Sequence, residues 1–146
     1  TDLTFDPGTG ANAYVRALAV VNGGNQRGKI LAGGGFASFN GVQRNSIVRL
    51  NPDGSVDPTF NPGFGADGPI YSIVPGPCGG SFVAGDFQTF DGVPRRGIAL
   101  LNENGTLDAT FNTGAGPNGP VNSIAVVSAT TSTARRATRR RARATA

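Results

Sequence analysis

Histidine, tryptophan and methionine are absent from this chain of 146 residues, and cysteine and lysine occur once each, as Cys78 and Lys29. A Ser-His-Asp or Cys-His catalytic group needs histidine, and the common zinc sites need several histidines or cysteines. A disulfide framework needs at least two cysteines. The composition excludes these nucleophiles, these metal sites and a disulfide framework, and we expect neither a cofactor nor an enzymatic activity.

Long apolar runs are also missing. No run of about 18 apolar residues occurs, so no membrane span is predicted, and no apolar signal segment follows Thr1. Glycine and proline are abundant instead, with 23 and 10 residues. Both are poor helix formers and frequent turn residues. The composition therefore favours an all-β fold of many short strands joined by turns.

The formal net charge of +4 is set by the C-terminal end of the chain. Seven of the 13 basic residues lie before residue 135 together with all nine acidic residues, so residues 1–134 carry a net charge of −2. The other six basic residues are arginines between Arg135 and Arg143. Nothing in the mildly acidic body is typical of a protein that binds nucleic acid. A nucleic acid partner is therefore expected only through the Arg135–Arg143 segment, if at all.

The sequence repeats itself, with periods of 55 and 51 residues counted between Phe5, Phe60 and Phe111. Each of these phenylalanines ends an Asp-x-Thr-Phe element, and each is followed by a Gly-x-Gly element. The segment Phe36–Arg44 matches Phe87–Arg95. Internal repeats of this length are the mark of solenoids and propellers.

Four strand-like runs are predicted within one repeat, at residues 15–21, 29–33, 46–50 and 55–60. Asn51-Pro52-Asp53-Gly54 joins the last two as a tight hairpin turn, since proline and Asp-Gly suit the turn positions. Pro58 has no amide to donate to a ladder, which places the last run at an edge. Four antiparallel strands in about 50 residues are the unit of a β-propeller blade.

The motifs D-x-T-F, G-x-G, K-I-L-x-G-G-x-F, F-x-G-V-x-R and R-L-N-x-D-G-S-x-D, in this order over residues 1–127, resemble the delta-60 repeat family of bacterial β-propeller-like proteins. The resemblance implies a multi-blade propeller in a secreted or cell-surface bacterial protein without a known catalytic role. The second copy departs from the pattern at Pro75–Cys78 and at Phe82–Asp86, which puts its second strand in doubt.

We therefore expect a partial β-propeller with two complete four-stranded antiparallel blades and flanking single strands. The blades span about residues 15–60 and 70–111, residues 1–5 close a preceding blade, and residues 121–127 open a following one. Closed propellers have about 4–8 blades. The expected partners are thus further propeller blades of the same parent chain.

The repeat stops after Val127, and residues 128–146 contain only serine, alanine, threonine and arginine. Three interpretations stay open. The segment is an out-of-frame or truncated coding end, a solvated disordered tail, or a basic arm that docks on phosphates.

Several motifs have both a functional and a structural interpretation. Asn51, Asp53 and Asp57 offer oxygens to calcium, but a hairpin turn explains them without a metal. The Gly-x-Gly elements lead into strands, not helices, which favours turn geometry over a phosphate cradle. Recurrence in both repeats favours inter-sheet packing over sugar stacking for four aromatic side chains, namely Phe36, Phe39, Phe87 and Phe90. Phe64 does not recur in the other repeats, so its exposure to solvent is the one to check for a binding role.

Arg44 and Arg95 recur at the end of the connection between the second and third strands of each repeat. They are predicted to pair with Asp57 and Asp108, or to form loop-face contacts at one end of the propeller together with Asn40 and Asp91. Cys78 lies in a Pro/Gly turn with no basic neighbour to activate it, and no role is predicted for it.

The sequence is consistent with two functions. The first is a non-catalytic structural or interaction module of a secreted or cell-surface protein, which works through loop surfaces. The alternative is a carbohydrate- or ligand-binding, lectin-like propeller. Exposed aromatic side chains beside Asn or Asp on one end of the propeller would favour the alternative.

Overall fold

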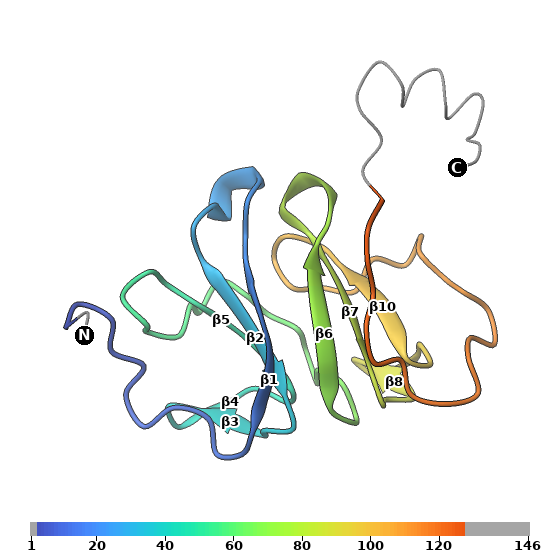
Figure 1. The fold of residues 1–146 in the computed structure, drawn as a ribbon, viewed down its shortest axis with the longest axis horizontal. Helices are drawn as coiled ribbons and strands as arrows, with labels where there is room; N and C mark the ends of the chain where they lie inside the picture. Colours follow the sequence, from blue (N-terminus) through green and yellow to red (C-terminus); the bar gives the residue numbers. More distant parts are fainter. Residues whose placement is uncertain (1–2, 128–146) are drawn as a thin grey trace.

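The computed structural model describes residues 3–127 and contains two three-stranded antiparallel sheets that lie side by side (Figure 1). The first sheet has the strand order β1-β2-β5, and the second has the order β6-β7-β10 when it is counted in chain order. The bounds are β1 Val15–Val20, β2 Ile30–Gly34, β5 Ile47–Leu50, β6 Ile70–Pro75, β7 Ser81–Gly85 and β10 Ile98–Leu101. The predicted all-β, partial-propeller fold is confirmed, and the second strand of the second repeat forms as β7.

The predicted fourth strand of each repeat is reduced to a single bridge. Val56 pairs with Leu50, and Leu107 pairs with Leu101. The chain then turns, because the Asp57 carboxylate accepts hydrogen bonds from both the amide and the hydroxyl of Thr59. Pro58 has no amide that could extend the ladder. Each blade thus has three regular strands and a bridged outer edge.

The flanking segments contribute less regular structure than expected. Residues 3–5 and 121–127 form no strand, although Asp6 N donates to Asp53 O and Val121 N donates to Gly85 O. The interpretations of residues 128–146 fall outside the described part of the chain. Within residues 3–127, no helix is long and apolar enough to cross a membrane.

The turns follow the sequence prediction closely. The Asn51 amide bonds to Ser55 O over 2.8 Å, and Gly54, at φ 93°, bonds back to Asn51 O over 2.9 Å. Asp53 Oδ1 accepts the amide and the hydroxyl of Ser55. These bonds define the hairpin turn that was preferred over a calcium loop. Both glycines of each Gly-x-Gly element have positive φ, between 63° and 73°.

The connection between the second and third sheet strands carries a small hairpin in each repeat. These hairpins are β3 Ser38–Phe39 with β4 Val42–Gln43, and β8 Thr89–Phe90 with β9 Val93–Pro94. Short 3₁₀ segments, η1 Gly24–Gln26 and η2 Pro77–Gly79, form the tips of the β1–β2 and β6–β7 hairpins. Cys78 is exposed in the second tip, as the Pro/Gly turn predicts.

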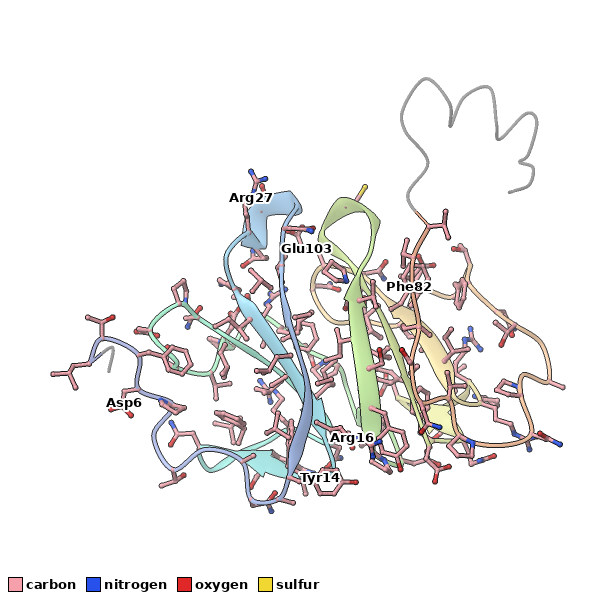
Figure 2. The ribbon with its side chains drawn as sticks, in the orientation of Figure 1. Asp6, Tyr14, Arg16, Arg27, Phe82 and Glu103 are labelled. Carbon is pink, nitrogen blue, oxygen red and sulfur yellow. The ribbon has the colours of Figure 1, made fainter. Side chains whose placement is uncertain are left out.

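The main core lies between the two sheets. Ile70 and Ile73 of β6 pack on Gly33 of β2, where an added Cβ would lie 2.8 Å from Ile70 Cγ2. Arg16 of β1, which is labelled in Figure 2, lies over a ring of the other sheet. Its guanidinium carbon is 4.1 Å from the centroid of Tyr71 on β6. A glycine on one sheet therefore accommodates large side chains of the other, and this fit sets the close approach of the blades.

The predicted packing between neighbouring sheets is confirmed for Phe87 and Phe90. Phe36 and Phe39 are buried too, but in a cluster on the face of the first sheet where no second sheet lies among residues 3–127. Phe87 and Phe90 are buried in the core between the sheets and meet edge to face, with ring centroids 6.4 Å apart. Phe36 and Phe39 form the equivalent edge-to-face pair at 6.0 Å, in a second cluster on the other face of the first sheet. Phe64 is 76 % exposed.

We expect Phe87→Ala to lower the free energy of unfolding by about 3–5 kcal/mol, because it leaves a cavity between the sheets. Phe64→Ala is the matched control and is expected to stay within about 0.5 kcal/mol of the wild type, since its ring is largely in solvent. Urea denaturation measures both variants. Equal losses in the two variants would contradict this account of the core.

Candidate functional site

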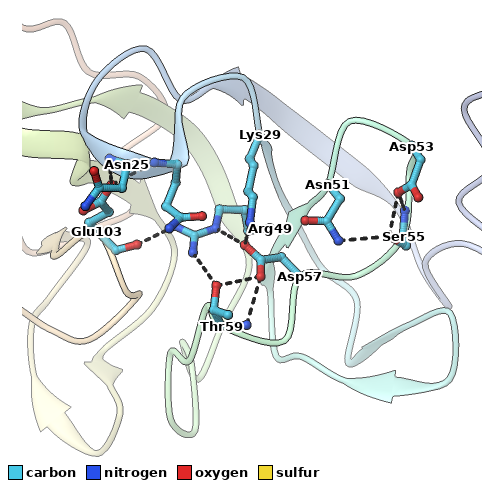
Figure 3. Close-up of polar contacts among 10 residues, drawn as sticks. Asn25, Lys29, Arg49, Asn51, Asp53, Ser55, Asp57, Thr59 and Glu103 are labelled. Atoms are coloured by element: carbon cyan, nitrogen blue, oxygen red, sulfur yellow. Dashed lines mark hydrogen bonds and ion pairs between the residues drawn. The ribbon is translucent and has the colours of Figure 1, made fainter.

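A cluster of charged and polar side chains lies where the first blade meets the turn of the second (Figure 3). The Asp57 carboxylate accepts hydrogen bonds from Lys29 Nζ and Arg49 Nε, both at 2.8 Å. It also accepts the Thr59 amide at 2.9 Å and the Thr59 hydroxyl at 2.7 Å. Asp57 and Arg49 are buried, with 1 % and 2 % exposed, so this ion pair is largely removed from water.

Arg49 extends the cluster from the first blade to the second. It lies on β5, beside the Phe60 ring, which is 4.8 Å from the guanidinium carbon. Its Nη1 donates to the backbone carbonyl of Glu103, and its Nη2 donates to Thr59 Oγ1 at 3.2 Å. A guanidinium has five donors in a fixed plane, which suits this simultaneous bonding to a carboxylate, a hydroxyl and a carbonyl.

Glu103 completes the link in the opposite direction. Its carboxylate accepts the backbone amides of Asn25 and Gln26 in η1, the latter at 3.0 Å. Figure 2 shows its side chain between the two hairpin tips, and Gly24 and Gly79 both lie beside it. Glu103 of the second blade thus accepts hydrogen bonds from the first blade at both its backbone carbonyl and its carboxylate.

The cluster holds its carboxylate in the charged state. Burial by itself raises the pKa of Asp57, but the hydrogen bonds from Lys29, Thr59 and Arg49 favour the carboxylate more strongly and hold the pKa well below its ordinary value of 3.8. A carboxylate bound in this way by two cations is poorly suited to take up a proton from a substrate near neutral pH.

A polar hollow of about 410 Å³ opens beside the cluster. Its lining combines residues of both blades: Gln26, Arg49, Thr59, Asn102, Glu103, Asn104 and Thr106. The only charged side chains in this lining, Arg49 and Glu103, already hold neighbouring groups across the blade boundary. Within residues 3–127, no group of three or more His, Cys, Asp or Glu side chains is placed to hold a metal ion. The hydrogen bonds of this site connect the two blades.

The second repeat lacks the corresponding cluster. Gly80 and Leu100 stand at the positions that are equivalent to Lys29 and Arg49. Asp108 keeps only the local turn, in which the Thr110 hydroxyl bonds at 2.6 Å and the Thr110 amide at 2.9 Å, and these bonds lower its pKa. The charged link is thus a property of one blade boundary and not of the repeat.

The predicted pairing of Arg44 with Asp57 is wrong, and so is that of Arg95 with Asp108. Arg44 Nη1 donates to Gln43 O at 2.8 Å, and Arg95 Nη1 donates to Pro94 O at 2.7 Å. Asp57 instead meets its cross-strand neighbour, since its amide bonds to Arg49 O. Among the described residues, the buried Nε atoms of both arginines have no hydrogen-bond partner.

Asn40 and Asp91 take equivalent places on the loop face. Asn40 Oδ1 accepts the Thr9 amide at 3.1 Å, and Asp91 Oδ1 accepts the Phe64 amide at 2.9 Å. Each side chain thus anchors a Gly-x-Gly turn. The second of these turns borders a hollow of about 270 Å³, which is lined by Gln43, Asn45, Gly63, Phe64 and Asp91. The structure brings Asp91 together with an exposed aromatic ring, whereas Arg44, Arg95 and Asn40 do not line this hollow.

Sequence reasoning missed Lys29, Arg49 and Glu103 as partners at the blade boundary. One signal was available, because Arg49 lies within Ile47-Val48-Arg49-Leu50, where a charge in an otherwise apolar strand needs a buried counter-charge. Nothing comparable marked Glu103, since its partners are backbone amides 77 and 78 residues away.

Both repeats are similar to a known propeller family. Residues 28–60 and 82–111 match the model of a family that is described as a domain of unknown function (DUF5122) beta-propeller. The first matched segment contains β2 to β5, and the second begins one residue inside β7 and extends through β10; both include the turn that follows. No curated protein and no solved structure matches the chain. The matches support the propeller repeat and name no activity.

The Asp57 cluster predicts a defined acid dependence of stability. The folded-state pKa is lowered, so the contribution of Asp57 is fully present above the unfolded value near 3.8 and is lost as the pH falls below it. We expect the melting temperature of Asp57→Asn to be lower than that of the wild type at pH 7 and to change less between about pH 5 and about pH 2.

Thermal melts monitored by circular dichroism across this range measure the difference. Asp86→Asn, which removes an exposed carboxylate, is the matched control and is expected to follow the wild-type profile. Parallel profiles for the wild type and Asp57→Asn would show that Asp57 is not the stabilising carboxylate.

Proposed function

We propose that this chain is a non-catalytic β-propeller repeat module whose role is structural, and that the outer face of its first sheet docks a further blade. One observation carries the proposal: Leu18 is 69 % exposed on β1, whereas Ile73, at the equivalent position of β6, is 7 % exposed. Leu18 pairs with Ala32 and Ile73 pairs with Val83, which establishes that the two positions correspond.

The two apolar clusters support the same conclusion residue by residue. The cluster on the outer face of the first sheet consists of Ala32, Phe36, Phe39, Val48 and Leu50, with Phe5, Ala11, Ile30 and Val56 packed against it. The core between the sheets contains the counterparts of most of these residues, namely Val83, Phe87, Phe90, Ala99, Leu101, Phe60, Ala66 and Leu107. That core also contains Leu31 and Ile47 from the neighbouring blade, which cover it.

No neighbouring blade lies on the outer face of the first sheet among residues 3–127. The cluster on this face is itself buried, and Val15, Leu18 and Val20 of β1 remain exposed beside it. Exposed apolar side chains that gather on one strand favour an interaction surface. Because the equivalent face of the second sheet is covered by the first blade, a further blade is the partner that we propose for this face.

The proposal includes a secreted or cell-surface location. It is supported by the resemblance of the repeated motifs to the delta-60 repeat family. Fractionation of cells that express the parent gene tests this part: recovery in the medium or the envelope supports it, and recovery in the cytosol contradicts it.

Carbohydrate binding is a second candidate function, and one specific observation favours it. The exposed Phe64 ring borders the hollow that also contains Asn45 and Asp91 at the loop face. An exposed aromatic ring beside Asn and Asp side chains at one end of the propeller is the arrangement expected of a lectin-like module.

Blade docking predicts head-to-tail association of the chain through the outer face of the first sheet. We expect sedimentation velocity to show association that increases with concentration up to about 1 mM, where even a weak interface of about −4 kcal/mol is populated. Leu18→Glu should abolish the association and leave the melting temperature unchanged, since the side chain is exposed. Ile73→Glu should unfold the chain. A wild-type chain that stays monomeric, or association that persists in Leu18→Glu, would contradict the proposed docking face.

A further inference from the structure

Phe64 occupies a position at which the fold does not require an aromatic residue. The equivalent positions in the other two Gly-x-Gly elements are Thr9 and Ala115. Phe64 is 76 % exposed, and it is the one phenylalanine in the described chain that lies mostly in solvent. The face of this ring is therefore accessible to a ligand.

The backbone holds the ring in a fixed place. The Phe64 amide donates to Asp91 Oδ1 and the Phe64 carbonyl accepts from Asn45 Nδ2, both at 2.9 Å. Gly65 bonds back to Pro62 O at 3.0 Å and accepts the Asp91 amide at 2.7 Å. A ring on such an anchored turn loses little conformational entropy when it binds a ligand.

The hollow beside the ring is small and mixed in polarity. Its volume of about 270 Å³ is slightly below the roughly 300–1,000 Å³ of pockets for drug-sized molecules, which suits a single ring. Gln43 and Asn45 supply carboxamides, and Asp91 supplies a carboxylate. The Gln43 side chain makes no hydrogen bond to any described residue, so both its donor and its acceptor are available to a ligand.

These groups fit the chemistry of a sugar ring. A pyranose in the chair form has a face of C–H bonds, which carry a small positive charge and are attracted to the negative face of an aromatic ring. Its rim of hydroxyl groups donates to carboxylates and exchanges hydrogen bonds with carboxamides. An anionic ligand would meet Asp91 and a body whose net charge is negative, whereas an uncharged sugar avoids this repulsion.

We propose that Phe64, Gln43 and Asp91 form a binding subsite for one pyranose residue of an uncharged glycan. The ring of Phe64 stacks on the C–H face, and the Gln43 carboxamide and the Asp91 carboxylate bind hydroxyl groups at the rim. This inference rests on the second candidate function, carbohydrate binding, and assigns it a location and a ligand class. It is independent of the proposed blade docking, which uses the outer face of the first sheet.

The test uses the complete chain and three uncharged β-linked probes, namely cellopentaose, xylopentaose and mannopentaose. Each is titrated to about 10 mM, because a site for a single ring is expected to have a Kd near about 1 mM. Binding is followed by the chemical shifts of the Phe64 ring protons and by calorimetry. We expect at least one probe to shift the Phe64 resonances in a saturable manner.

Three variants of Phe64 separate stacking from simple hydrophobic contact. Phe64→Trp should retain binding, whereas Phe64→Leu and Phe64→Ala should weaken it by at least about tenfold, since an aliphatic side chain lacks the ring face. Leu18→Ala, at another exposed apolar side chain, is the matched control and should bind like the wild type. Equal binding by Phe64→Leu and the wild type would overturn the stacking role.

Asp91→Asn tests the carboxylate without removing the turn. Asn40 shows that a carboxamide oxygen can hold this turn, because it accepts the Thr9 amide in the first repeat. We therefore expect Asp91→Asn to keep the wild-type melting temperature and to bind the sugar several-fold more weakly. Unchanged binding would remove Asp91 from the site.

The outcomes also separate this inference from the function on which it rests. Binding that persists in Phe64→Ala would overturn the subsite and leave carbohydrate binding standing at another place. Failure of all three probes to bind would overturn both. Neither result changes the expected association through Leu18, so the structural role stands or falls separately.

Discussion

The fold depends on one constraint: each sheet is apolar on both faces and must be covered on both. The first sheet covers the second by placing Gly33 opposite Ile70 and Ile73, so that the backbones approach closely. In repeat proteins each unit contacts its neighbours, and the interface between neighbouring units contributes to the stability of both. The main apolar core of this chain therefore lies at the boundary between the blades and not within one blade.

A buried polar cluster distinguishes this boundary. Removing Asp57 and Arg49 from water is costly, and the cost is offset only because every group finds a partner, including the Glu103 carbonyl of the next blade. The second repeat has Leu100 where the first has Arg49. The second sheet therefore has no guanidinium at this position to donate hydrogen bonds to a following blade. Repeats that share a backbone thus differ in the side chains that they present to a neighbouring blade.

Most of the fold was predictable from the sequence, because it follows from local chemistry. The positions of glycine, proline and Asp-Gly determined the turns, and the repeat period determined the number of blades. The fourth strand was over-predicted, since the Asp57-Pro58-Thr59 segment has the composition of an edge strand but bonds to itself. The flanking segments were also over-predicted, because residues 121–127 have an apolar pattern but no ladder partner in the described chain.

The site was less predictable, because its contacts join residues that are distant in sequence. Asn40 and Asp91 were identified through the repeat, and their equivalence holds in the structure. The arginines were paired incorrectly, because recurrence in both repeats drew attention to Arg44 and Arg95. The ion pair belongs to Arg49, which does not recur. Features that repeat report on the fold, and features that break the repeat, such as Arg49, Glu103 and Phe64, report on what distinguishes each blade.

The stacking of the two sheets is tested most directly by nuclear Overhauser effects in the intact chain. The account predicts cross-peaks between the methyl protons of Ile70 and the α-protons of Gly33, together with cross-peaks between Ile73 and the same glycine. Their absence, with the cross-strand peaks within each sheet still present, would show that the blades form without packing on each other and would contradict the account.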